Sequence, residues 1–281
     1  MKIYCAAFVL LLLMFLSDSP DATKPRPLFN GKNLKGWETY IGPAYDSAQE
    51  KFTGKPFGLD VDPSRVFSVV QVDEKGAIRI SGEHFGGIST KESFQNYHLR
   101  LEFKWGQKKW HPKKNSARDS GLLYHAVGPH AGDGSFWMRS QEFQIQEGDC
   151  GDYWGVAGAF ADIPASEKGK GQYVYDPAAP LVTFRDRTPV GRHCIKHPDA
   201  ENPSGEWNTI DLYCVGDTSV HVVNGAVNMV LYNLRQEDGA SILPLTKGKI
   251  QIQSEGAEVF YRNISIESIR QIPTALLTSN Q

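Results

Sequence analysis

Apolar and polar residues alternate along most of the chain. In residues 97–105 every odd position is apolar and every even position is polar, which is the pattern of a strand with one buried face. Asn224-Gly225, between two apolar runs, is the strongest hairpin signal. Shorter alternating stretches, separated mostly by glycine-containing turns, occur at 66–72, 77–81, 142–147, 208–215, 219–223, 249–253 and 259–269. Because no long stretch has a helical period, we predict an all-β fold, a two-sheet jelly-roll β-sandwich.

Two stretches do not read as strands. Residues 106–119 are basic and polar, and we interpret them as a solvated loop, with a rim for an anionic ligand as the alternative. Residues 161–203 are rich in Pro, Gly and charge. A structureless loop of that length is uncommon in a compact domain, so we expect short elements or a functional role there. No repeat or linker divides the chain, and we predict a single domain over residues 23–281.

The N-terminus has the pattern of a signal peptide. Lys2 precedes an apolar run at 3–16, which small and polar residues follow. The run is shorter than the roughly 20 residues that cross a bilayer comfortably. We therefore predict a signal peptide over residues 1–22, with an uncleaved anchor as the alternative. The rest of the chain is expected to be periplasmic or secreted, without stable membrane insertion.

Export changes the interpretation of the cysteines, because an oxidising compartment permits disulfides. Cys150 and Cys194 lie in loop-like sequence, whereas Cys214 shares the parity of Ile210 and Leu212 in a predicted strand. We predict a Cys150–Cys194 disulfide, with Cys214 a buried free thiol.

Charge excludes one class of partner. The 281 residues contain 30 Lys and Arg against 32 Asp and Glu, a formal net charge of −2. This leaves no basic excess to neutralise phosphates, so no nucleic-acid partner is expected.

Several short motifs follow one another along the chain. They are 28–37 (LFNGKNLKGW), 87–90 (GIST), 97–104 (YHLRLEFK), 120–124 (SGLLY), 142–146 (EFQIQ), 205–208 (GEWN), 224–225 (NG), 248–256 (GKIQIQSEG) and 261–264 (YRNI). This ordered set resembles one bacterial family, the 3-keto-disaccharide hydrolase domain. The chain departs from the family where Asp119 stands in place of the usual Asn, and where Tyr124-His125 replaces a frequent Arg. The resemblance implies a concanavalin A-like lectin/glucanase fold and an activity on sugars oxidised at C3.

Polar side chains share one face of two predicted strands. Phe143 and Ile145 point to one side of their strand, which turns Glu142, Gln144 and Gln146 to the other. Gln251, Gln253 and Glu255 repeat this pattern. If the strands are neighbours, their amides and carboxylates suit sugar hydroxyls. A solvated sheet face is the plain alternative, and the resemblance favours a binding face.

The same strand argues against a standard glucanase. Similar jelly-roll glucanases use Glu-x-Asp-x-Glu, where this chain has Glu142, Gln144 and Gln146. Ordinary glycoside hydrolysis needs a pair of carboxyl groups, and only Glu147 or Asp149 at the strand end could supply the second. A 3-keto sugar needs a base for the C2 proton, stabilisation of the enolate, and an acid for the leaving group.

Glu142 and His125 are the candidate base and acid. The predicted substrate-binding residues are Gln144, Gln146, Arg139, Trp137, Tyr124, Gln253 and Glu255; Trp110 and Trp154 are further candidates for stacking on a sugar. The other histidines, at positions 84, 98, 111, 130, 193, 197 and 221, are interpreted as structural.

A divalent cation is possible, although no cofactor is certain. Donors for it would be His125, Glu142, Glu147, Asp149 and Asp152, but the chain has no His-x-x-x-His or Cys-x-x-Cys spacing.

Two classes of function remain open. The first is an exported enzyme that cleaves the glycosidic bond of 3-keto-glycosides, by elimination or hydrolysis, with a small sugar as its partner. The second is a non-catalytic, lectin-like carbohydrate-binding module, since the fold supports both. A standard glucanase is a weaker third hypothesis.

Overall fold

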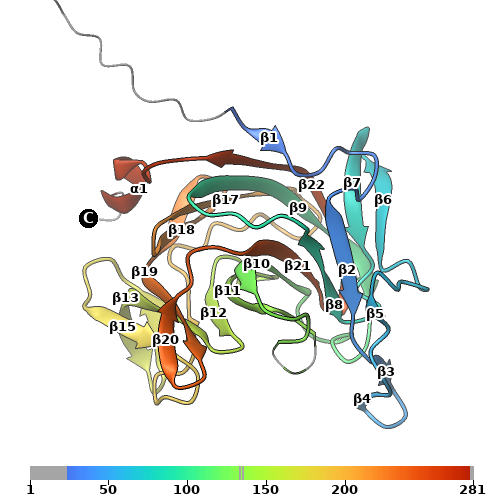
Figure 1. Cartoon of the computed structure of the whole chain (residues 1–281), viewed down its shortest axis with the longest axis horizontal. Coiled ribbons are helices and arrows are strands. Elements are labelled where there is room, and N and C mark those ends of the chain that lie inside the picture. The colour runs from blue at the N-terminus through green and yellow to red at the C-terminus, as the bar shows by residue number, and fades with distance from the viewer. Residues whose placement is uncertain (1–23, 133, 135, 279–281) are drawn as a thin grey trace, which may run out of the picture.

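Two antiparallel sheets pack face to face in the computed structural model, which describes residues 24–132, 134 and 136–278 (Figure 1). The predicted signal peptide at 1–22 lies outside the described residues. The larger sheet runs in the order β14 (Gln172–Tyr175), β13 (Ala159–Gly169), β19 (Ala226–Asp238), β18 (Thr218–Val223), β17 (Asn208–Val215), β9 (Tyr97–Lys109), β22 (Ala257–Ser268), β7 (Lys75–Ile80) and β6 (Phe67–Val72). Three short strands extend it, namely β1 (Arg26–Pro27) on β22, β15 (Leu181–Phe184) on β13 and β20 (Ser241–Pro244) on β19.

The smaller sheet carries the polar strands. Its order is β16 (His193–Cys194), β12 (Tyr153–Val156), β11 (Arg139–Gln146), β10 (Asp119–Val127), β21 (Lys249–Ser254), β8 (Gly86–Thr90), β2 (Trp37–Ile41) and β5 (Gly58–Leu59). A separate hairpin joins β3 (Ala44–Asp46) to β4 (Lys51–Thr53), and the helix α1 (Thr274–Thr278) follows β22. The predicted two-sheet jelly roll is confirmed.

The core lies between the two sheets, where the alternation predicted it. Phe143 and Ile145 of β11 are fully buried, as are Leu101 and Phe103 of β9. The pleat sends every second side chain to this interior, so the residues between them face away from the core.

The structure confirms the predicted hairpin turn and shows strands in both segments that did not read as strands in the sequence. Asn224 and Gly225 have φ values of 50° and 85°, which is the left-handed conformation that a two-residue hairpin turn requires. Residues 161–203 contain most of β13 and all of β14, β15 and β16, so that segment does hold short elements. By contrast, residues 106–109 continue β9 rather than beginning a loop.

The predicted disulfide is wrong in this structure. Cys150 and Cys194 are both buried free thiols. Cys194 is paired across the sheet with Tyr153, and its Sγ donates to the Ile195 carbonyl at 3.8 Å. Its loop-like sequence therefore conceals a strand, which directs the thiol into the core. Cys214 is a buried free thiol, as predicted.

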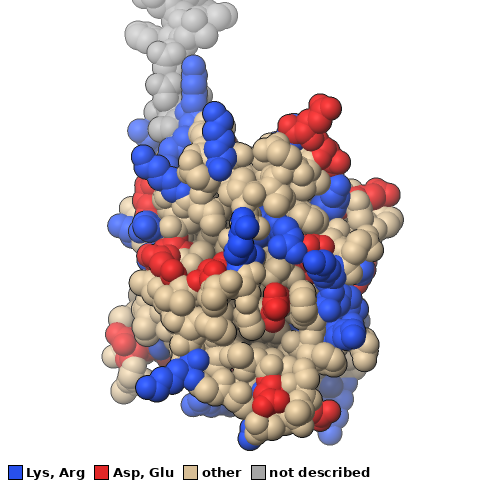
Figure 2. Space-filling view, turned by 90° about the vertical axis from the view of Figure 1, so that its right-hand side faces the viewer, with Lys and Arg blue, Asp and Glu red and all other residues tan. Residues whose placement is uncertain are grey.

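Charge is dispersed over the surface beside β2, β6 and β7. Figure 2 shows Lys and Arg interspersed with Asp and Glu on this face rather than gathered into one basic patch. Among the described residues, no helix has the length and apolar character needed to cross a membrane.

Candidate functional site

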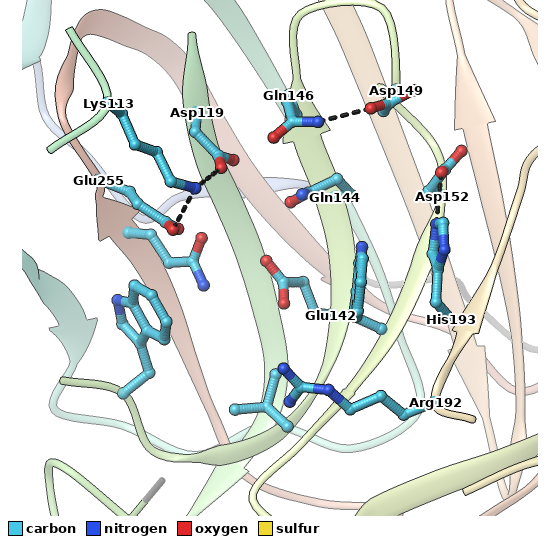
Figure 3. A pocket seen from close by; sticks show the side chains of 14 residues that line it. Lys113, Asp119, Glu142, Gln144, Gln146, Asp149, Asp152, Arg192, His193 and Glu255 are labelled. Carbon is cyan, nitrogen blue, oxygen red and sulfur yellow. Dashed lines mark hydrogen bonds and ion pairs between the residues drawn. The ribbon is translucent and has the colours of Figure 1, made fainter. Parts of the chain in front are cut away.

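A cavity of about 290 Å³ lies over the outer face of the smaller sheet (Figure 3). Strand β10 lies between β11 and β21, with Gly121 opposite Gln144 and Leu122 opposite Ile252. The two polar strands are thus close but not adjacent. The cavity is lined by Lys113, Asp119, Trp137, Glu142, Gln144, Gln146, Asp149, Asp152, Trp154, Val156, Arg192, His193, Gln253 and Glu255.

Gly121 allows the two polar strands to meet across β10. A Cβ atom built at Gly121 would lie 2.2 Å from Glu142 Oε1 and 2.5 Å from Gln253 Oε1. Real Cβ atoms essentially never approach another heavy atom this closely. The glycine therefore leaves the space in which a carboxyl from β11 and an amide from β21 converge over the middle strand.

Glu142 occupies the floor of the cavity and is only 6% exposed. With its amide turned to the orientation that gives both ends a partner, Gln144 donates its nitrogen to Glu142 Oε1 at 3.1 Å and to the Ser120 carbonyl at 3.0 Å. Burial, together with the nearby carboxylates of Glu255 and Asp119, raises the pKa of Glu142 well above its ordinary value. A carboxyl group with a raised pKa holds its proton more tightly and is a stronger base once ionised.

Lys113 brings a positive charge to the same cavity. Its Nζ forms ion pairs with Glu255 Oε1 at 2.6 Å and with Asp119 Oδ2 (Figure 3). Burial alone would lower the pKa of Lys113, but these two carboxylates outweigh burial and raise it. The ammonium charge is therefore maintained. The basic segment 106–119 is more than a solvated loop, because it delivers this cation.

A second polar group lies at the β12–β16 end of the cavity. His193 Nε2 is 2.7 Å from Asp152 Oδ2, and its ring stacks on Trp154 with centroids 4.1 Å apart. Asp152 Oδ1 accepts from the Lys196 backbone at 2.9 Å. The Arg192 guanidinium carbon lies 5.3 Å from the centroid of the Trp154 ring. The carboxylate thus holds the imidazole in place, and Trp154 packs against His193.

The sequence singled out Trp154 as a stacking candidate and Asp152 as a metal donor, but it did not indicate that they meet His193 and Arg192. His193 was interpreted as structural, and Arg192 was not singled out. Asp152 lies about forty positions before His193, and the two meet only because β12 pairs with β16, placing Trp154 opposite His193. No local signal marks that pairing, since β16 has only two residues.

Two predicted site residues of β10 lie in the interior instead. His125 is fully buried between the rings of Tyr97 and Tyr124, and its Nδ1 is 3.0 Å from the Leu245 carbonyl. Burial lowers its pKa to about 4. The register of β10 with its two neighbours shifts at this point, and the His125 ring lies in the core. The His125 assignment as catalytic acid is wrong.

Tyr124 and Arg139 are not substrate contacts in this structure either. The Tyr124 hydroxyl lies in the core, 2.8 Å from Ser219 Oγ and 3.1 Å from His221 Nε2. Arg139 Nε donates to the Ala157 carbonyl at 2.8 Å, away from the cavity lining. Tyr124 thus connects the two sheets, and Arg139 binds the turn between β12 and β13.

The remaining predicted contacts line the cavity. Gln144, Gln146, Trp137, Gln253 and Glu255 all do so. Gln146 Nε2 donates to Asp149 Oδ2 at 2.5 Å, and Trp137 Nε1 donates to the Gly86 carbonyl at 3.1 Å.

The suggested set of metal donors does not come together. His125 is in the core, and Glu147 is ion-paired with Arg118 at 2.9 Å. Within residues 24–132, 134 and 136–278, no group of three or more His, Cys, Asp or Glu is arranged to hold a metal ion.

The chain matches a known family over most of its length. The model of the 3-keto-alpha-glucoside-1,2-lyase-like domain matches residues 24–267. The chain belongs to this family. The resemblance inferred from the sequence blocks is therefore confirmed. Membership of this family makes the chain a carbohydrate-active, lyase-like domain. No curated protein matches the chain.

Solved structures similar to the lyase-like domain include enzymes and a binding module. A candidate glycosyl hydrolase from Parabacteroides distasonis is 21% identical over 87% of this chain and 94% of its own, with a TM-score of 0.49. The Bacillus licheniformis β-glucanase is 11% identical over 89% and 100%, with a TM-score of 0.43. The Bacillus subtilis carbohydrate-binding module CBM66 is 9% identical over 72% and 92%, with a TM-score of 0.40.

Proposed function

We propose that this protein cleaves the glycosidic bond of 3-keto-glycosides by elimination across C1 and C2. Its family membership supports the reaction class. The observation that carries the proposal is Glu142, a buried carboxyl of raised pKa in a cavity that also holds the Lys113 ammonium and the Arg192 guanidinium.

The chemistry follows from the ketone. A carbonyl at C3 acidifies the hydrogen on C2, so a base can remove that proton and leave an enolate. The enolate electrons then form the C1–C2 double bond as the bond from C1 to the glycosidic oxygen breaks. The departing oxygen takes up one proton, and the products are a conjugated enone and a free alcohol. Addition of water to C1 of the enone would complete a net hydrolysis.

Glu142 is assigned as the base. A raised pKa strengthens a carboxylate as a base and brings it towards the operating pH. The hydrogen bond from Gln144 fixes the orientation of the carboxyl group. In the assigned roles, the two cations near Glu142 stabilise the negative charge that develops on the C3 oxygen.

His193 replaces His125 as the proton donor to the leaving oxygen. It lines the same cavity, and Asp152 holds its Nε2. An imidazole oriented by a carboxylate is a common acid–base group.

Ordinary hydrolysis fits the site less well. Asp119 and Glu255 could supply a second carboxyl group, but Lys113 is ion-paired with both. Gln144, at a position where glucanases carry a carboxylate, is an amide that donates to Glu142.

The test compares a 3-keto-disaccharide with its unoxidised parent. We expect near-ultraviolet absorbance of the enone, or the reducing sugar formed from it, only with the oxidised substrate. Glu142→Gln should lower turnover by about 10²-fold or more, the scale of a positioned acid or base. Glu147→Gln is the matched control, because Glu147 lies just past the same strand but pairs with Arg118 outside the cavity.

Other outcomes would select another function. Equal cleavage of the unoxidised sugar would indicate a standard glycosidase. Binding of sugar without turnover of any 3-keto-glycoside would indicate a carbohydrate-binding module. A fully active Glu142→Gln variant would remove Glu142 from the mechanism.

We also propose that the protein is exported. The support is the apolar run at 3–16 after Lys2. Cell fractionation together with the mass of the purified protein tests this, since cleavage would remove about the first 22 residues.

A further inference from the structure

Two buried oxygen atoms at the cavity have no hydrogen-bond partner among the residues that the structure describes. They are Gln253 Oε1 and Asp119 Oδ1. Both residues line the cavity, and they are 1% and 2% exposed. Buried polar atoms are nearly always hydrogen-bonded, so each such exception calls for an explanation. A ligand in the cavity that carries hydroxyl donors would satisfy both.

One of the two acceptors lies beside the cation, and the other lies above Gly121. Asp119 presents Oδ2 to Lys113, which leaves its Oδ1 unpaired beside the ammonium group. Gln253 Oε1 faces the space above Gly121, the space that Glu142 Oε1 enters from the other side. Along the sheet, the order is therefore Glu142 on β11, then Gly121 on β10, then Gln253 on β21.

This order orients a 3-keto sugar. A ketone oxygen accepts hydrogen bonds but cannot donate them, so it belongs beside Lys113 and not against an unpaired acceptor. If C2 faces Glu142 and the C3 oxygen faces Lys113, the next carbon, C4, lies towards β21. Its hydroxyl group is then the donor nearest to Gln253.

We propose that Gln253 Oε1 accepts a hydrogen bond from the C4 hydroxyl next to the ketone. The inference rests on the proposed function, because the position of C2 at Glu142 sets the orientation. It makes 3-keto-glycosides with a free C4 hydroxyl the preferred substrates. A sugar linked through O4 to another residue lacks this donor, so we expect terminal residues of 1,4-linked chains to bind more tightly than internal ones.

The experiment measures binding in the absence of turnover. The Glu142→Gln protein is titrated calorimetrically with a 3-keto-glucoside and with its 4-deoxy analogue. We expect the 4-deoxy compound to bind about tenfold more weakly, the usual scale of one lost hydrogen bond. Adding Gln253→Met, which removes the acceptor but keeps the length of the side chain, should abolish that difference.

Gln251→Met is the matched control. Gln251 is a buried amide on the same strand that donates to Ser89 Oγ at 2.9 Å and does not line the cavity. In this background the tenfold difference should persist. Gln253→Leu provides a second test, since it also lacks the acceptor, and it should abolish the difference even if the Gln253→Met variant does not fold.

The outcomes separate this inference from the proposed function. Equal binding of the parent and 4-deoxy compounds to Glu142→Gln would overturn the C4 assignment, even where the wild type eliminates the parent normally. Persistence of the difference in a folded Gln253→Met or Gln253→Leu variant would also overturn it. A protein that binds both 3-keto compounds with the expected difference, yet never eliminates either, would retain the C4 assignment and refute the reaction.

Discussion

Replacing Gly121 with Ala should separate activity from stability. The added methyl group would lie 2.2 Å from Glu142 Oε1 and 2.5 Å from Gln253 Oε1, so both side chains must move. The atoms that must move are the ends of flexible side chains and not backbone. The strand itself should therefore keep its position.

The size of the effect follows from the displacement. Restoring ordinary contact requires the Glu142 carboxyl to shift by about 1 Å, and misplacement of a reacting group by that amount can cost about 10²-fold in rate. The stability should change little, because Gly→Ala at a compatible backbone position contributes about 0.4–1 kcal/mol through the unfolded state, which offsets part of the local strain.

The assay pairs initial rates on a 3-keto-disaccharide with thermal unfolding of the same preparations. Gly248→Ala is the contrasting variant, since its Cβ would lie 2.3 Å from the backbone carbonyl carbon of His125. That variant should lose stability through clashes with backbone. If Gly121→Ala keeps full activity, the convergence of Glu142 and Gln253 is not the reacting centre; if it unfolds like Gly248→Ala, the argument from flexible side chains is wrong.

Three further outcomes are expected. Burial lowers the folded-state pKa of His125 to about 4, below its usual 6.5, so its contribution to stability is lost as pH falls from 6.5 to 4. In urea unfolding, the free energy of unfolding of His125→Asn should therefore fall by about 3 kcal/mol less than that of the wild type over this pH range. Turnover of the variant at neutral pH should persist. If the free energies of unfolding of the wild type and the variant change equally with pH, this explanation is wrong. His193→Gln should lower kcat by about 10²-fold, as expected for a proton donor, and an unchanged kcat would remove it from the mechanism. Cys150 and Cys194 should react with a thiol reagent in denaturant without a reductant. If neither reacts, the two residues form the disulfide after all.

Local pattern was enough to predict the sandwich and part of the site. A strand alternates its side chains whatever its neighbours are, so burying Phe143 and Ile145 necessarily turned Glu142 and Gln144 outwards. The same parity placed Gln253 correctly. These residues could be identified because the pattern that reveals them is contained in a few consecutive positions.

Tertiary structure alone decided the rest of the site. Asp152 and His193 meet through the pairing of two short strands, and Lys113 reaches the cavity from a segment that looks like an ordinary solvated loop. His125 lies where the register of β10 shifts, and no sequence pattern indicated that its ring would be buried. Sequence periodicity reports which face a residue takes within one strand; it carries no information on which distant strands become neighbours, and that pairing is what assembled the charges around Glu142.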